Sequence, residues 1–234
     1  MYNIIDLLIE VVFIIVILVF ALLPHEVAHG YTAMLLGDNT AKYQRRLTLN
    51  PFRHINPAYA GWIFGGILLG KLIPQLGFLT DLMVWVGFVL LLKPVPIHPA
   101  NFRDPKKGMA ITALMGPVTN LVIAFVGMFL WVLSVKTEIP YVGTYLNLFF
   151  QLLVVYNIRL AVFNLIPVPP LDGSRVLFAF LPTRYYFKVM QYERYIMIIF
   201  LLLVYNGTFD LLLNRGSQNI FNAFFGIVSK VMGL

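Results

Sequence analysis

Hydrophobic residues along the chain are gathered in long runs that short polar segments separate, and strict alternation of apolar and polar positions is not the dominant pattern. Three long runs cover about residues 4–36, 108–135 and 144–168, and a shorter one covers about 195–213. At about 1.5 Å per residue, each long run forms a helix that can cross a hydrocarbon layer about 30 Å thick. The pattern therefore predicts an all-α polytopic membrane protein with three core transmembrane helices and additional membrane segments.

The stretch from about residue 60 to 92 is hydrophobic but less regular. Lys71, Pro74 and Asp81 interrupt it, and it contains six glycines. Irregular backbone is tolerated at membrane depth where protein or a water-filled cavity covers it. We expect two short membrane segments that return to the same side, as a re-entrant or β-like hairpin.

Composition supports the membrane assignment. Of the 234 residues, 60% are hydrophobic and 12% are charged, whereas soluble domains carry about 25% charged residues. We expect residues 1–234 to form a single integral-membrane domain that contacts the lipid bilayer. The chain has no cysteine, so any metal has to be held by His, Asp or Glu.

The net charge of +7 comes from short basic loops, at about residues 42–56, 93–107 and 171–194. Basic loops between membrane spans stay in the cytoplasm, which predicts a multi-pass protein of the cell membrane with its N-terminus outside. No basic stripe with a docking motif is present, so nucleic acid is not an expected partner.

The first run contains His25, Glu26 and His29, which form an H-E-x-x-H motif. Two histidines four residues apart share one face of a helix and can bind one zinc ion, while the glutamate is aimed at a water molecule. The thirteen residues before Pro24, 11–23, include no polar side chain. Ionisable groups inside a membrane indicate a functional site.

A catalytic zinc site needs a third protein ligand. Asp172 is the strongest candidate, because three prolines in the stretch from Asn164 to Gly173 (N-L-I-P-V-P-P-L-D-G) force an extended course at the end of the third long run. Asp172 could instead cap a helix that begins at Gly173. The other candidates lie in basic loops or near the outer ends of spans: Asp6, Glu10, His54, His98 and Asp210.

The H-E-x-x-H motif, followed later by N-x-x-P-x-P-P-x-D-G, resembles the site-2 protease family of intramembrane zinc metalloproteases (peptidase family M50). The runs G-P-V-T-N (116–120) and N-P-F-R-H-I-N-P (50–57) also resemble its compact bacterial branch, which lacks PDZ and CBS domains. The resemblance implies one zinc ion bound by His25, His29 and Asp172, with Glu26 as general base. It also implies cleavage of a transmembrane substrate near its cytoplasmic end, in regulated intramembrane proteolysis.

Two asparagines are candidates for the catalytic machinery. Asn164 and Asn120 can donate hydrogen bonds to the substrate backbone or to a developing oxyanion. Both also have a structural alternative: Asn164 can bond a carbonyl freed at the end of its helix, and Asn120 can tie helices together.

Two other functions remain open at this stage. The same ligands could form a transit site in a metal-binding membrane transporter, or the protein could be a catalytically inactive membrane scaffold. The expected partner of the protease is a single-span transmembrane protein, while the substrate's identity and the oligomeric state are not predicted by any feature of the sequence.

Overall fold

The computed structural model describes residues 4–137, 142–182, 189 and 191–233. Over these residues the chain is helical and contains no β-strand, apart from an isolated bridge between Ile55 and Leu92. Three of its helices are long and apolar enough to cross a membrane. The expected all-α polytopic fold class is therefore confirmed.

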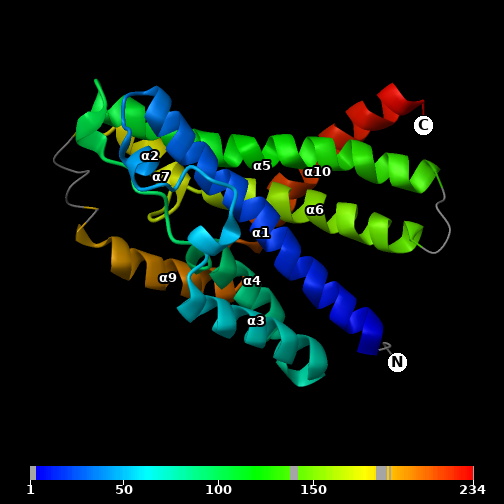
Figure 1. Ribbon diagram of the computed structural model, residues 1–234. Helices are drawn as coiled ribbons and strands as arrows, with labels where there is room; N and C mark the ends of the chain where they lie inside the picture. Colours follow the sequence, from blue (N-terminus) through cyan, green and yellow to red (C-terminus); the bar gives the residue numbers. More distant parts are fainter. Residues whose placement is uncertain (1–3, 138–141, 183–188, 190, 234) are drawn as a thin grey trace.

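The three long helices form the centre of the molecule. They are α1 (Ile4–Leu35), α5 (Pro105–Lys136) and α6 (Gly143–Asn164). Helices α5 and α6 lie side by side along most of their length, and α1 crosses them (Figure 1). Gly127 of α5 faces Leu153 and Val154 of α6 with no side chain of its own, the kind of small-residue contact through which membrane helices pack closely.

A loop on the same side as the metal motif follows α1. It contains α2 (Thr40–Tyr43) and the 3-10 turn η1 (Pro51–Arg53). Gly37 has φ +109°, the left-handed conformation that ends many helices and that glycine adopts without strain. His54 is fully buried, with its Nε2 2.9 Å from the Thr48 carbonyl oxygen, so it anchors the loop.

Residues 57–90 form a helical hairpin of α3 (Pro57–Leu72) and α4 (Phe78–Leu90), joined through the turn η2 (Pro74–Leu76). The β-like form that we considered for this stretch is therefore wrong. Its glycines serve helix contacts instead: a Cβ on Gly70 would lie 2.5 Å from Thr80 Oγ1. The hairpin packs on α1 through buried residues such as Ile63 and Ile67.

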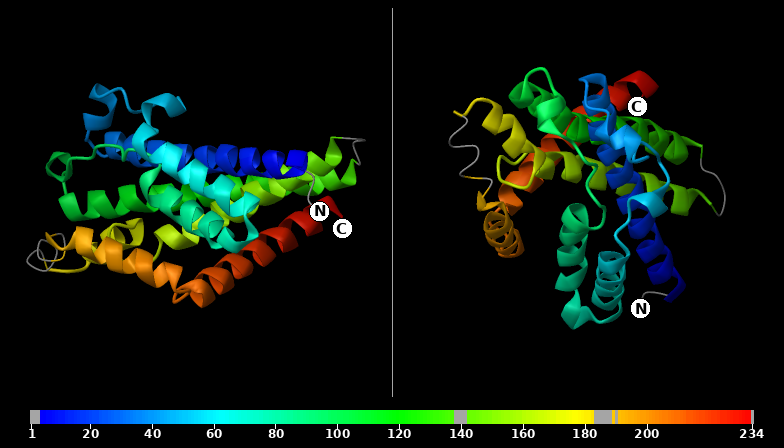
Figure 2. Two further views of the ribbon diagram at one scale, coloured as in Figure 1. Left: turned by 90° about the horizontal axis from the view of Figure 1, so that it is seen from below. Right: turned by 60° about the vertical axis from the view of Figure 1, so that its left-hand side comes forward.

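The last part of the chain differs from the single span expected at 195–213. Helix α9 (Glu193–Tyr205) ends in a turn with Gly207 at φ +74°, and α10 (Asp210–Met232) begins directly after it. The two helices form a V, and both termini lie at the same end of the molecule (Figure 2). Lys136 Nζ donates to the Met232 carbonyl oxygen at 2.6 Å, so α10 ends beside the end of α5.

Candidate metal centre

The two histidines of the H-E-x-x-H motif lie on one face of α1, close to its C-terminal end. Helix α1 continues through Pro24 without a break, which keeps His25 and His29 one turn apart. Their side chains point away from lipid and into the protein, since the two residues are only 4% and 7% exposed.

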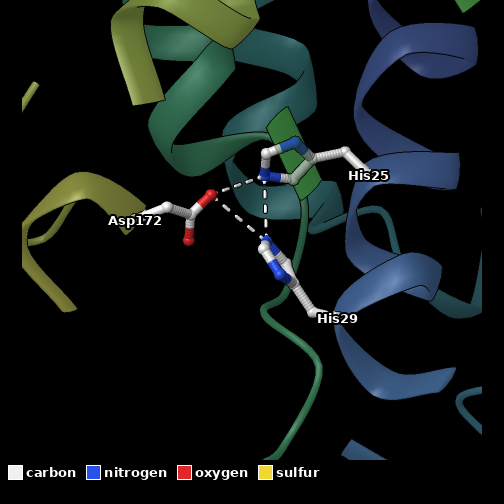
Figure 3. A group of neighbouring side chains, drawn as sticks. All are labelled: His25, His29 and Asp172. Atoms are coloured by element: carbon white, nitrogen blue, oxygen red, sulfur yellow. Dashed lines mark hydrogen bonds and ion pairs between the residues drawn. The ribbon is translucent and has the colours of Figure 1, made fainter. Parts of the chain in front are cut away.

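Asp172 meets both histidines from another part of the chain. It is the first residue of α7 (Asp172–Ala179), directly after the proline-rich stretch that follows α6. Its Oδ2 lies 3.1 Å from His25 Nε2 and 3.3 Å from His29 Nε2, and the two Nε2 atoms are 3.0 Å apart (Figure 3). Within the described residues this is the one His, Asp or Glu group close enough to hold a metal ion.

Hydrogen bonds at the far side of each ring determine which nitrogen is free. His29 Nδ1 lies 2.7 Å from the Thr112 carbonyl oxygen, which can only accept. His25 Nδ1 lies 2.6 Å from Asn120 Oδ1, which is also an acceptor because the amide nitrogen of Asn120 is directed elsewhere. In the neutral rings, both Nδ1 atoms carry the hydrogen and both Nε2 atoms present a lone pair.

Three electron-pair donors therefore converge on one small space. Asp172 Oδ2 is buried and receives no hydrogen bond from any residue that the structure describes, although it faces the two Nε2 lone pairs. A buried polar atom without a partner is costly, and a bound cation would satisfy all three atoms at once. Two imidazoles and a carboxylate are a ligand set that suits zinc.

Asn120 orients the first histidine through a buried network. Its Nδ2 donates to the Ala21 carbonyl oxygen at 2.9 Å and to Asn157 Oδ1 at 2.8 Å. Both amide hydrogens are thus used inside the protein. In this arrangement the amide oxygen of Asn120 supports His25, and its two amide hydrogens bond within the protein.

Two glycines make room for the group. A Cβ on Gly116 would lie 2.5 Å from ring atoms of both His25 and His29, and a Cβ on Gly173 would lie 2.3 Å from the Leu165 carbonyl oxygen. Real Cβ atoms do not approach other atoms so closely. Gly116 therefore lets α5 pack against the two imidazoles, and Gly173 lets α7 begin against the end of α6.

Glu26 lies beside the histidines and faces a cavity of about 530 Å³. Its Oε2 accepts a hydrogen bond from the Val95 backbone N–H at 2.8 Å. The cavity is also lined by the three residues of the metal group and by Asn56, Tyr59, Asn164 and Arg175. A carboxylate, a potential metal site and open space for a substrate thus occur together.

Asn164 lies at the edge of this cavity as the last residue of α6, and it is 9% exposed. Its Nδ2 donates to the Leu160 carbonyl oxygen at 3.1 Å, a local bond within its own helix. A primary amide has a second hydrogen and an acceptor oxygen, so this bond leaves Asn164 able to contact a bound ligand.

Three contributors to the site were not expected from the sequence: Thr112, Asn157 and Val95. Thr112 and Val95 act through backbone groups, which no side-chain pattern signals. Asn157 is a buried polar residue within a membrane span, and that feature alone could have singled it out.

Two buried histidines and an aspartate, beside a glutamate on a cavity, are the residues that a metalloprotease requires, and here they lie in a helical membrane protein. Comparison with known proteins supports that class. The profile of the family described as "Peptidase family M50" matches residues 138–204, a segment that includes Asp172. No solved structure matches the chain.

Similar proteins extend the match over the rest of the chain. "Putative zinc metalloprotease YwhC" of Bacillus subtilis is 34% identical over 227 residues, which cover 94% of each chain. "Putative zinc metalloprotease MJ0611" of Methanocaldococcus jannaschii is 30% identical over 135 residues, which cover 50% of this chain and 65% of that protein. The chain belongs to peptidase family M50. The group of His25, His29 and Asp172 can hold one metal ion, and its ligand set suits zinc.

Proposed function

We propose that the protein is an intramembrane zinc metalloprotease that hydrolyses a peptide bond in a transmembrane substrate near the cytoplasmic end of that substrate. The observation that carries the proposal is the position of Glu26 on a cavity that the three potential metal ligands also line. This cavity is bounded by helices long and apolar enough to cross a membrane, so a substrate cleaved in it has to enter the membrane interior.

In this mechanism His25, His29 and Asp172 hold the metal. Zinc, when bound, acts as a Lewis acid and lowers the pKa of water so that a nucleophile is available at neutral pH. Glu26 serves as general base, takes a proton from water and returns it to the leaving amine. Because Val95 N–H holds one carboxylate oxygen of Glu26, the other oxygen is the one that handles the proton.

The two asparagines are proposed to have different roles. Asn164 lines the cavity, and its remaining amide hydrogen is available to the substrate backbone or to an oxyanion. Asn120 positions His25 and does not touch the substrate, because its oxygen and both amide hydrogens are engaged.

The proposed orientation has the metal site toward the cytoplasm and the N-terminus outside, in the cell membrane. The basic residues Arg45, Arg46 and Arg53 are in the loop after α1, at the end of α1 that carries the histidines. Cytoplasmic loops are enriched in such residues. We further propose that residues 1–234 act as one membrane-embedded domain.

The proposed substrate is a single-span transmembrane protein, and its cleavage is a step of regulated intramembrane proteolysis. A helical substrate shields its peptide bonds with its own hydrogen bonds. The scissile segment therefore has to unwind before Glu26 and the metal can reach it.

The test uses purified protein in detergent and a library of single-span peptides. Wild type is compared with Glu26→Gln, and the zinc content of both is measured. Cleavage by wild type, with retained zinc and no cleavage in Glu26→Gln, would support the protease. A wild type that binds zinc but cuts none of the peptides would oppose it, and metal flux in liposomes would then test for a transporter.

A further inference from the structure

The cavity next to the metal group has one wall made of extended chain. Residues 93–98 (K-P-V-P-I-H), which we call the wall segment, run between α4 and the 3-10 turn η3 (Pro99–Asn101). Lys93, Pro94, Val95 and Ile97 line the cavity. The wall segment is also the source of the one hydrogen bond that the Glu26 carboxylate accepts from the described part of the chain.

The sequence leaves a single donor at this point. Pro94 and Pro96 have no backbone N–H, so Val95 carries the only amide hydrogen of residues 94–96. A shift of the wall segment by one residue would place a proline nitrogen opposite Glu26. Because no neighbouring amide can substitute, the bond depends on how the wall segment is held at its two ends.

Asp38 holds the C-terminal end of the wall segment. This residue follows α1 and is fully buried. Its Oδ2 accepts from the His98 backbone N–H at 2.7 Å, and its Oδ1 accepts from Asn101 Nδ2 at 2.7 Å. Oδ1 also accepts from the backbone N–H and the hydroxyl of Thr40, at 3.0 and 2.5 Å. A carboxylate with four donors forms strong bonds of defined geometry.

The N-terminal end of the wall segment is held by the loop after α1. Arg46 donates to the Lys93 carbonyl oxygen at 2.9 Å and also to the carbonyl oxygen of Arg53. The backbone N–H of Lys93 donates to the His54 carbonyl oxygen at 2.7 Å. This end rests on exposed bonds of Arg46 and on one backbone pair, whereas the other end is bonded to the buried carboxylate of Asp38.

We propose that Asp38 is a positioning residue of the protease: it anchors His98 and thereby sets the place of Val95, whose amide holds Glu26 in the orientation needed to act on water. The proposal rests on the proposed role of Glu26 as general base. Glu26 lies in α1 and Asp38 lies just after the end of α1, and residues 95–98 of the wall segment connect the two carboxylates. Displacements of about 1 Å in a catalytic group can cost about 100-fold in rate.

The experiment measures the placement of Val95 and the catalytic rate separately. Hydrogen exchange, with fragmentation that resolves single residues, follows the amides of the wall segment in zinc-loaded protein. We expect Asp38→Ala to accelerate exchange at both His98 and Val95 by about tenfold or more, while zinc content is kept. With a cleaved peptide substrate, kcat should fall about 10- to 100-fold and KM should change much less.

Two variants serve as references. Glu26→Ala should accelerate exchange at Val95 and leave His98 unchanged, because it removes only the acceptor of Val95. Asp104→Ala is the matched control: Asp104 caps α5 by accepting from the Lys107 N–H at 3.1 Å and is exposed. Asp104→Ala should lower thermal stability, and it should change neither the exchange rate of the Val95 amide nor kcat relative to KM.

The proposal is overturned if Asp38→Ala accelerates exchange at His98 alone, or if kcat is unchanged. It is also overturned if kcat falls only as far as in an equally destabilised Asp104→Ala. If Asp38→Ala does not fold, Asp38→Asn takes its place, since it keeps the volume and loses one acceptor; faster exchange at Val95 and a lower kcat are again required. A wild type that cleaves nothing refutes the proposed protease, whereas the exchange measurements still report on the anchor.

Discussion

At the scale of single residues, the two histidines are oriented by different kinds of acceptor. His29 Nδ1 donates to a backbone carbonyl of Thr112, which no substitution removes. His25 Nδ1 donates to the side chain of Asn120, which is itself fixed by Ala21 and Asn157. The partners behind metal ligands set ring orientation and basicity. Mutation of a side chain can therefore remove the acceptor of His25 but not the acceptor of His29.

Replacing Asn120 with alanine should weaken zinc binding by about 10- to 100-fold, the usual cost of losing a partner behind a metal ligand. The physical reason is that His25 loses the acceptor that directs its Nε2 toward the metal. Zinc affinity is measured by competition with a chelator. An Asn120→Ala protein with the affinity of wild type would contradict this role.

A second residue-scale prediction concerns Gly116. A Cβ added at this position would lie 2.5 Å from ring atoms of His25 and His29. Both rings are held in place by hydrogen bonds at Nδ1. Gly116→Ala should therefore abolish zinc binding and lower thermal stability. Gly127→Ala, on the same helix, is the control: the nearest atom to its Cβ is a Val154 methyl at 3.2 Å. Equal zinc content in the two variants would show that space at Gly116 is not critical.

At the scale of elements, the length of apolar runs was enough to predict α1, α5 and α6. The same runs did not reveal the form of the α3–α4 hairpin, because glycines that serve close helix contacts resemble glycines that break helices. The division between α9 and α10 did have a signal. Asn206–Gly207 is a dipeptide typical of turns, and apolar residues on both sides of it masked the interruption.

The candidate site shows a similar division between what side chains and backbone reveal. The spacing of His25, Glu26 and His29 and the proline-rich stretch before Asp172 predicted the group that the structure brings together. The hydrogen bonds of Thr112 and Val95 depend on how distant segments pack, and backbone groups have no signature in the sequence. Asn120 was recognised as a candidate, yet only its three hydrogen bonds indicate a positioning role.

Asp38 leads to a pH prediction for the junction of α1 with the wall segment. Burial opposes its charged form, but hydrogen bonds from Thr40, Asn101 and His98 outweigh burial and hold the pKa of Asp38 below its ordinary value of 3.8. The stabilisation is therefore complete above pH 3.8 and is lost as the pH falls further, through the lower pKa of the folded protein. Thermal unfolding midpoints of wild type should drop over this range more than those of Asp38→Asn. Parallel curves for the two proteins would contradict the assignment.

At the scale of the whole molecule, the hairpin is joined to the core by an ion pair. Lys71 Nζ in α3 lies 2.5 Å from Glu10 Oε1 in α1, and both side chains are about three-quarters buried, at 27% and 28% exposure. Charges at membrane depth are stable only when they are paired or reach water. This pair and the apolar contacts of Ile63 and Ile67 therefore hold the hairpin against α1.

Removing one charge of the Lys71–Glu10 pair should lower the free energy of unfolding more than removing both charges. Lys71→Met leaves the Glu10 carboxylate without its cation and should destabilise the protein by about 1–3 kcal/mol. The double variant Lys71→Met with Glu10→Gln should recover part of that loss. Unfolding in detergent measures both, and a double variant that is less stable than Lys71→Met would show that the pair does not couple the two helices.

The metal group has a further consequence because its members come from distant parts of the chain. His25 and His29 are in the first helix, and Asp172 follows the third long helix. An ion bound by all three acts as a cross-link that closes a long loop, in a chain that has no cysteine for a disulfide. Cross-links of this kind stabilise a fold by restricting its unfolded state. Chelation should therefore loosen the contact of α7 with α1 and α5, and metal supply would control how long the protein persists as well as its activity.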